Sequence, residues 1–340
     1  MLTGTAGMSQ VPSFSQVCQF ENLGKGGHLA ARKGKRDRRE VIDFELDLGR
    51  NLVQLSRELE DGTYRMDPYV RFEVADPKRR LIHALRYRDR VVQHALCDNV
   101  VAPVLQPRLI YDNAACQRGK GTHFALDRLE GFLREHYRAH GAQGWFLKCD
   151  VRHFFASIQH DVMKVLLRRP PFDARTYAFL CQVIDSYADA PGRGLPLGNQ
   201  TSQWFALYYL DGVDRLIKER LHVRAYVRYM DDMVLVHASK AHLRACLDAV
   251  RNACSALGLQ LNGKTQIAPL RQGIDFLGWH LYLTDTGRVV RRLRQAAKRR
   301  LLRGAAAARA LPAGQWRQVR ASYQAHLAHG DTQGLRRLVG

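Results

Sequence analysis

Two adjacent carboxylates, Asp231 and Asp232, follow Tyr229 and Met230 between two short apolar runs. Runs of β-forming residues separated by a tight polar turn are typical of a β-hairpin, whose tip would present both acids. Neighbouring carboxylates raise each other's pKa, and Mg²⁺, which prefers oxygen ligands, supplies a counter-charge. A solvated Asp-Asp turn is the alternative, and a lone pair of acids would favour it.

A third acid, Asp150, follows the apolar stretch that begins at Trp145, and the chain continues into Phe154 and Phe155. A carboxylate at the end of a strand is well placed to meet the tip of a neighbouring hairpin. Three carboxylates around two metal ions would form a phosphoryl-transfer site, in which one ion activates the attacking hydroxyl and the other stabilises the leaving oxygen. A helix N-cap or a surface ion pair is the alternative for Asp150.

These two segments resemble motifs C and A of the reverse transcriptases. The resemblance implies two Mg²⁺ ions, with Mn²⁺ as a substitute, held by the catalytic Asp150, Asp231 and Asp232 and by the backbone carbonyl of Val151. It also places Tyr229 and Met230 beside the primer and template. Phe155 falls where the family has an aromatic steric gate that rejects a 2′-hydroxyl. Phe154 is interpreted as a core residue.

A glycine turn at residues 194–203 precedes a helical pattern from Trp204 to Arg220 and resembles motif B, which contacts the incoming nucleotide and the template base. Most reverse transcriptases have Gln-Gly-x-x-x-Ser-Pro here, whereas this chain has Leu-Gly-x-x-x-Ser-Gln at Leu197, Gly198, Ser202 and Gln203. This departure resembles the reverse transcriptases of diversity-generating retroelements. Leucine cannot make the hydrogen bonds of glutamine, and lost polar contacts reduce discrimination between substrates. The family resemblance implies errors concentrated at template adenines.

A helix expected between Ser239 and Gly258 leads to a loop with Lys264, which resembles motif D. The resemblance implies that Lys264 is catalytic and gives a proton to the departing pyrophosphate, and a solvated loop lysine is the alternative. The next segment resembles motif E, the primer grip: Phe276, Leu277, Gly278 and Trp279. An ordinary buried strand is the alternative for it.

Basic residues among glycines upstream resemble the family's fingers motifs, where they would bind the triphosphate of a dNTP. The candidates are Arg79, Arg80, Arg118 and Lys120. Surface salt bridges are their common alternative. A further basic segment at residues 25–39 would contact either nucleic acid or a protein, and the sequence does not choose between them.

The chain of 340 residues has a formal net charge of +21 and 46% apolar residues. So large a positive charge favours a polyanion partner. Residues 281–340 contain thirteen Lys and Arg but only two acids, Asp285 and Asp331, with apolar positions at Leu293, Ala297 and Leu301. We therefore expect a short helical thumb that holds the phosphates of a template–primer duplex.

We expect an α+β, right-hand polymerase fold with an antiparallel palm sheet backed by helices. The predicted divisions are an N-terminal helical and basic extension (1–60), fingers (61–145), a palm with motifs A to E (146–280) and a helical basic thumb (281–340). The seven cysteines lack metal-site or disulfide spacing, which favours reduced thiols in a cytoplasmic protein. No apolar stretch is long enough to cross a bilayer, so no membrane partner is expected.

The predicted activity is RNA-directed DNA polymerisation, which copies an RNA template into cDNA from dNTPs, with errors at template adenines. The resemblance implies a bacterial or phage-encoded enzyme, an RNA/DNA duplex and a small, basic, helical, oligomeric accessory protein as partner. Two alternatives stay open. One is a retron, defence-associated or group II intron-like reverse transcriptase of ordinary fidelity, and the other is a non-catalytic nucleic-acid-binding protein.

Overall fold

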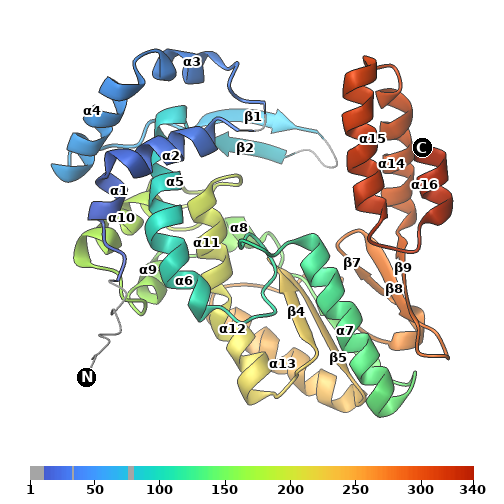
Figure 1. The fold of residues 1–340 in the computed structure, drawn as a ribbon. Coiled ribbons are helices and arrows are strands. Elements are labelled where there is room, and N and C mark those ends of the chain that lie inside the picture. Colours follow the sequence, from blue (N-terminus) through green and yellow to red (C-terminus); the bar gives the residue numbers. More distant parts are fainter. Residues whose placement is uncertain (1–10, 33, 76–79) are drawn as a thin grey trace, which may run out of the picture. The chain divides into compact units, whose positions relative to one another are not determined.

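The protein is described from a computed structural model that covers residues 11–32, 34–75 and 80–340 (Figure 1). The chain divides into two compact units, each built from segments that are distant in the sequence. Unit 1 ends at Ile110 in its first segment and adds Arg152–Gly212 and Ser255–Leu259. Unit 2 comprises Tyr111–Val151, Val213–Cys254 and Gln260–Gly340. The linear division predicted from the sequence is a different partition and stays a prediction.

Unit 1 is mainly helical and contains one two-stranded antiparallel hairpin. The hairpin strands are β1 (Val70–Val74) and β2 (Arg80–Ala84). The helices are α1 (Ser15–Cys18), α2 (Phe20–Ala30), α3 (Arg39–Leu46), α4 (Leu48–Glu60), α5 (Tyr87–Leu96), α6 (Ala102–Leu105), α8 (Phe154–Ser157), α9 (His160–Leu167), α10 (Ala174–Asp185) and α11 (Gln200–Tyr209). A π-helical turn (Cys97–Val101) joins α5 to α6, and a 3₁₀ turn (Gln106–Arg108) follows α6.

Three segments of unit 1 follow from local sequence patterns. The β-forming runs between residues 63 and 85 give β1 and β2, and residues 89–96 lie within α5. The helical spacing from Val41 to Leu59 corresponds to two helices, because Asp47 leaves helical geometry at φ −127° and ψ 48°. The buried positions Leu52, Leu55 and Leu59 then share one face of α4, as the spacing indicates.

Unit 2 is organised around a four-stranded antiparallel sheet in the order β4-β5-β3-β6. Its strands are β3 (Trp145–Cys149), β4 (Tyr226–Tyr229), β5 (Asp232–His237) and β6 (Gln266–Pro269). The predicted β-hairpin around residues 230–231 is confirmed as β4 and β5, and the predicted strand before Asp150 is β3.

Helix α7 (Thr122–His140) packs on one face of this sheet through Leu126, Leu129 and Leu133, which share a buried cluster with Phe146 and Val234. Helix α13 (Lys240–Ala256) lies on the other side in Figure 1. It begins after Ser239, whose hydroxyl accepts from the His242 amide at 3.2 Å, so the predicted N-cap is confirmed. The short helix α12 (Asp211–Arg215) and a π-helical turn (Leu216–Arg220) precede β4.

The rest of unit 2 is a second sheet followed by three helices. The sheet has the order β7-β8-β9, with β7 (Ile274–Phe276), β8 (Trp279–Leu283) and β9 (Val289–Leu293), and a 3₁₀ turn (Leu270–Gln272) precedes it. The helices are α14 (Gln295–Ala308), α15 (Ala313–Leu327) and α16 (Gln333–Val339). The C-terminal region was expected to be helical from residue 281, but its first helix begins at residue 295. Leu293, expected in a helix, ends β9, and the boundary placed at residue 280 falls inside β8.

All seven cysteines are free thiols, and only Cys116 is exposed. No helix in the described part of the chain has the length and apolar character that a bilayer crossing requires.

Candidate active site

The register of the unit 2 sheet brings Asp150 to the β4–β5 hairpin. Cys149 pairs with Met233 across β3 and β5, so Asp150, one residue further along, lies opposite Asp232. Side chains alternate between the faces of a sheet, which puts Asp150, Asp232 and Lys148 on the same face. Asp231 belongs to the turn between β4 and β5. The structure therefore brings together the three aspartates that the sequence singled out.

The aspartates of this cluster repel one another. Burial raises the pKa of Asp231 to about 7, with a hydrogen bond to Asp150 and the negative charge of Asp150 as further causes. Burial also raises the pKa of Asp232, which the Lys148 ammonium opposes from 3.3 Å. Carboxylates that lie close together at a partly buried site favour binding of a proton or of a cation.

Two residues for which the sequence predicted no role, Asn262 and Lys148, hold the cluster in place. Asn262 donates its backbone amide to the Asp150 carbonyl at 2.6 Å and its side-chain amide to the Asp150 carboxylate at 3.2 Å. Lys148 donates to the Asp275 carbonyl at 2.7 Å while its ammonium faces Asp232. The sequence signal for Lys148 was a lone charge within the apolar strand β3.

A buried ion pair supports the turn of the hairpin from the opposite face of the sheet. Arg228 and Asp214 have fully buried side chains, and the guanidinium donates to the carboxylate from Nε at 2.7 Å and from Nη2 at 2.5 Å. The Tyr226 hydroxyl donates to the same carboxylate at 2.6 Å. The remaining Nη1 donates to the Met230 carbonyl at 2.8 Å.

This contact matters because Met230 has a positive φ of 55°, which an L-residue adopts only at a cost of about 1–2 kcal/mol. The Arg228 guanidinium fixes the peptide that leads directly into Asp231. Sequence reasoning missed both members of the pair. The available signal was Arg228 itself, a charge between Val227 and Tyr229 in a buried strand.

The chemistry of the donor set fits a divalent cation, because the cluster consists of carboxylates whose repulsion such an ion would relieve. Asp150, Asp231 and Asp232 are the residues that would hold it, and when bound it would supply charge stabilisation to a phosphoryl group. Within the described ranges, no three acidic, histidine or cysteine side chains already have a metal-binding arrangement. Metal binding by these residues and by the Val151 carbonyl stays a prediction. Val151 forms an isolated bridge with Leu261.

The loop after Tyr111 carries two predicted triphosphate ligands, and they differ in the structure. Arg118 is exposed and forms no hydrogen bond or ion pair with the described residues. Lys120 instead donates to the Tyr111 carbonyl at 2.7 Å and to the Asn113 carbonyl at 3.1 Å. Its ammonium would have to leave these carbonyls to bind a phosphate, whereas Arg118 is available as it stands. Arg79 and the side chain of Arg80 lie outside what the structure describes.

The predicted motif A gate and motif B residues belong to unit 1. Phe154 is buried, and its ring lies 5.7 Å from that of the half-buried Phe155. The Phe155 carbonyl accepts from the Leu195 amide at 2.9 Å, which ties α8 to the loop before α11. Gly198 has a positive φ of 103° with open space where a side chain would begin. Leu197, Gly198 and Gln203 line one cavity, whereas Ser202 is buried.

The predicted primer grip is the turn between β7 and β8. Phe276 and Trp279 pair across it and are fully buried, so these two rings belong to the core. Leu277 (φ 49°) and Gly278 (φ 86°) form the two-residue turn. The exposed side chain of Lys264 is compatible with the alternative of a solvated loop lysine, and the Lys264 backbone amide donates to the Asn262 side chain at 3.1 Å.

Comparison with known proteins identifies the family. The model of the family described as reverse transcriptase (RNA-dependent DNA polymerase) matches residues 75–281, more than half of the chain. The chain belongs to the reverse transcriptase family. This match indicates a nucleotidyltransferase domain, and the matched region contains Asp150, Asp231 and Asp232. No curated protein matches the chain.

A solved structure shows the fold of this reverse transcriptase. It is the apo telomerase of Candida tropicalis truncated from its C-terminal domain, with a TM-score of 0.50 and 12% sequence identity. The match covers 71% of this chain and 59% of the telomerase chain, so the chain spans less than two thirds of that relative. Together with the mixed helices and antiparallel sheets, the match confirms the expected right-hand polymerase fold.

Proposed function

We propose that this reverse transcriptase is an RNA-directed DNA polymerase that copies an RNA template into cDNA from dNTPs. The observation that supports the proposal most is the meeting of Asp150 with the β4–β5 hairpin, where burial and Asp150 raise the pKa of Asp231 to about 7. Carboxylates that repel one another in this way are suited to hold cations at a phosphoryl group. A non-catalytic nucleic-acid-binding protein would have no need to bury these acids beside one another.

In this proposal the two units have different tasks. The unit 2 aspartates hold the cations, Arg118 neutralises the triphosphate, and Lys264 supplies the proton for pyrophosphate. In unit 1, Phe155 excludes the 2′-hydroxyl, and Leu197, Gly198, Ser202 and Gln203 contact the nucleotide and template base. After residue 280, the exposed residues among thirteen Lys and Arg hold the duplex phosphates, whereas Arg291 is buried and paired with Asp127 and Glu130.

The test is primer extension on a DNA-primed RNA template with Mg²⁺ or Mn²⁺. We expect the wild type to extend the primer and Asp231→Asn to lose extension while retaining duplex binding. The matched control is Asp248→Asn, since Asp248 is an exposed acid on α13 that pairs with Arg251 on the surface. Extension by Asp231→Asn at the rate of the control would remove the proposed site.

We further propose that the enzyme is error-prone at template adenines and acts in a diversity-generating retroelement. The support is the apolar Leu197 and the Ser202–Gln203 pair in motif B, where most of the family has Gln and Ser-Pro. Sequencing of cDNA should show several-fold more misincorporation opposite adenine than opposite the other bases, and Leu197→Gln should reduce it. Accurate copying of adenine would leave the polymerase but favour a retron, defence-associated or intron-like enzyme.

On the same assignment, we propose that the protein is cytoplasmic and encoded by a bacterium or phage, and that its partner is a small, basic, helical, oligomeric accessory protein. Copurification of this accessory protein with the reverse transcriptase from the native cell would test the partner. Extension of a cognate RNA by the purified chain alone, at the rate found in cell extract, would argue against a required accessory protein.

A further inference from the structure

Helix α8, which carries the predicted gate Phe155, is too short to hold its own position. It has four residues and follows His153, whose φ is 47°. Helices shorter than about 12–15 residues are marginal in water unless other parts of the protein pack against them. The place of the Phe155 ring therefore depends on the backbone that α8 contacts.

That backbone is the loop 192–195, which lies between α10 and α11. The Gly194 amide donates to the Ile158 carbonyl at 2.9 Å, and the His160 amide donates to the Gly192 carbonyl at 2.9 Å. Ile158 and His160 are both buried. These bonds join the end of the predicted motif A to the loop that leads into the predicted motif B.

A single peptide group, the one between Gly194 and Leu195, connects the His160 ring to the gate. Its carbonyl accepts from His160 Nε2 at 2.8 Å, and its amide donates to the Phe155 carbonyl at 2.9 Å. Since the acceptor is a carbonyl, Nε2 carries the proton. Hydrogen bonds at the two ends of one peptide group strengthen each other, and loss of the imidazole would leave a buried carbonyl unpaired.

The same peptide group is also fixed by close packing. Gly194 has a φ of 106°, and a Cβ atom there would lie 2.5 Å from Asp189 Oδ2 and 2.7 Å from the Asp189 backbone nitrogen. Glycine alone fits this position. The orientation of the peptide group is thus set by packing as well as by the bond from His160.

The His160 ring is oriented from its second nitrogen. The Asp185 carboxylate lies 3.6 Å from His160 Nδ1 and pairs with the Lys164 ammonium at 2.7 Å. A carboxylate at one nitrogen of an imidazole leaves the other nitrogen to donate elsewhere. Here that donor is Nε2, and its acceptor is the Gly194 carbonyl.

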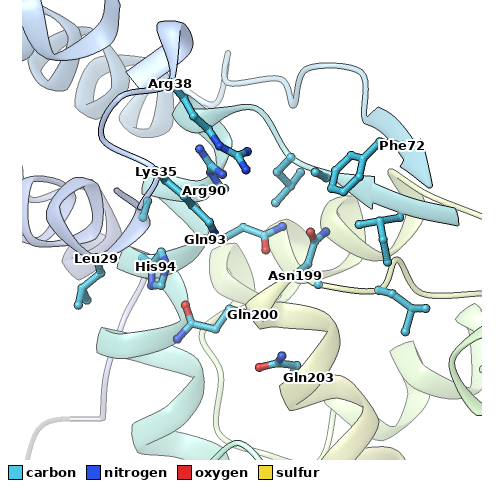
Figure 2. A pocket seen from close by; sticks show the side chains of 16 residues that line it. Leu29, Lys35, Arg38, Phe72, Arg90, Gln93, His94, Asn199, Gln200 and Gln203 are labelled. Carbon is cyan, nitrogen blue, oxygen red and sulfur yellow. The ribbon is translucent and has the colours of Figure 1, made fainter. Parts of the chain in front are cut away.

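The loop continues into the residues expected to contact the nucleotide and template base. Asn199, Gln200 and Gln203 line a cavity at the start of α11 (Figure 2). The peptide group held by His160 therefore lies between Phe155 and these residues along the backbone. A change in its orientation would shift the gate relative to them, and a misplacement of about 1 Å can cost about 100-fold in rate.

We propose that His160 is a positioning residue for sugar selection. By holding the Gly194 carbonyl, it fixes the peptide group that anchors the Phe155 backbone, and so keeps the Phe155 ring where a 2′-hydroxyl would clash. The inference rests on the proposed function, because it takes Phe155 to face the sugar of the incoming nucleotide.

The first experiment measures kcat and KM for single incorporations of dCTP and CTP opposite a template guanine. His160→Phe keeps a buried ring but removes the donor, whereas His160→Gln keeps an amide N–H that can reach the carbonyl. The matched control is Lys164→Gln, which removes the cation beside Asp185 and leaves the Nε2 bond in place.

We expect His160→Phe to lower the ratio of kcat/KM for dCTP to kcat/KM for CTP about ten-fold, with CTP used better than by the wild type. His160→Gln and Lys164→Gln should stay within about two-fold of the wild-type ratio. A merely structural role would reduce the use of both nucleotides in proportion. An unchanged ratio in His160→Phe, or an equal fall in all three variants, would refute the proposal.

A second variant moves the same peptide group with the His160 ring intact. Gly194→Ala places a methyl group against Asp189, so it should lower the dCTP-to-CTP ratio in the same direction. It decides the question if His160→Phe does not fold. Gly194→Ala with a melting temperature within a few degrees of wild type and a wild-type ratio would show that this peptide group does not control the gate.

Hydrogen exchange tests the contact without chemistry, in EDTA and without nucleotides. The backbone amides of residues 192–197 should exchange faster in His160→Phe than in wild type and Lys164→Gln, and equal exchange would contradict the proposal. A wild type that incorporates neither nucleotide would remove the proposed function together with the sugar-selection role, and exchange would still decide whether His160 holds the loop. A wild type that incorporates dCTP, with an unchanged ratio in His160→Phe, would remove this inference alone.

Discussion

Aspartates from several elements lie against the two faces of the β4–β5 hairpin, and their environments on the two faces are opposite. On one face Asp214 receives three hydrogen bonds, two from the Arg228 guanidinium and one from Tyr226. On the other face Asp231 has another carboxyl, that of Asp150, as its neighbour, and its pKa rises to about 7. The partial counter-charge there is Lys148, which faces Asp232 at 3.3 Å.

The supply of hydrogen-bond donors distinguishes an acid with a structural role from acids that can bind a ligand. A buried carboxylate with a complete set of donors stabilises only the hairpin, because no coordination site is left open. The acids on the opposite face destabilise the free protein, and a cation would convert that repulsion into binding energy. The two arrangements are connected through Arg228, which also holds the Met230 carbonyl next to Asp231.

The largest expected effect comes from neutralising the repelling face. Asp231→Asn should reduce primer extension by about 10³-fold or more, because a cation ligand is lost. The same change should raise the melting temperature in EDTA by a few degrees, because the repulsion of Asp150 disappears. Extension assays and thermal unfolding check both effects.

Asp214→Asn is the comparison for Asp231→Asn. It removes charge from the neutralised face, so it should lower the melting temperature. If both aspartate variants moved the melting temperature in the same direction, the distinction between the two faces would fail.

The second effect concerns the ion pair. Arg228→Ala should destabilise the protein by about 3–5 kcal/mol, because Asp214 is left buried without a counter-charge. The double variant Asp214→Leu/Arg228→Met should recover most of the stability measured by denaturant unfolding. It should not recover kcat, because the Met230 carbonyl still lacks its donor.

A double variant with wild-type kcat would show that the pair acts only on stability. Arg228→Lys adds a further check, since it keeps the charge but not the geometry of the guanidinium. It should retain more stability than Arg228→Ala while its kcat falls and its KM for dNTP stays close to wild type.

A smaller effect is expected at Lys148. Lys148→Met removes the cation beside Asp232, so the melting temperature in EDTA should fall by a few degrees, about 2–4 °C for each kcal/mol lost. The rise in melting temperature on adding Mg²⁺ should become larger, because the ion no longer competes with an ammonium. A Mg²⁺ response smaller than that of the wild type would mean that Lys148 positions the acids instead of competing for them.

The sequence predicted the acid-bearing face well because strand alternation and a tight turn are local signals. Apolar runs on either side of Asp231 predicted the hairpin, and the strand before Asp150 predicted its partner. The end of the strand at Asp150 suggested that this carboxylate could meet the hairpin tip, and the family resemblance added support, but the sequence gives no register, because sheet register joins residues that are distant in the sequence.

The neutralised face was missed for the same physical reason. Asp214 and Arg228 lie on α12 and β4, and neither residue type indicates its partner until the elements pack. Gln93 and Gln200, which line a cavity of unit 1 together with Leu197 and Gln203, were missed too, because ordinary glutamines carry no sequence signal. The periodicity of apolar residues thus predicted the helices and strands, whereas the roles of their polar residues depend on which of them the packed fold buries together.

The smallest expected effect is a pH dependence that extends the comparison to cations. The His123 and His329 rings stack at 3.5 Å between centroids, and His326 lies beside them and next to Trp279. Burial lowers the pKa of His123, and the charges of His329 and His326 lower it further. A histidine whose pKa is lowered by folding is neutral in the folded protein at a pH at which it is charged in the unfolded chain.

Stability should therefore be fully present above the unfolded pKa of about 6.5 and be lost as the pH falls below it. We expect the melting temperature to fall by a few degrees between pH 7.5 and 5.5. His329→Gln should reduce that fall, because His123 then protonates without a charged ring stacked on it. An unchanged pH profile in His329→Gln would show that other buried histidines, such as His136, carry the effect. Repulsion between like charges would then affect stability at Asp150, Asp231 and Asp232 but not at the stacked histidines.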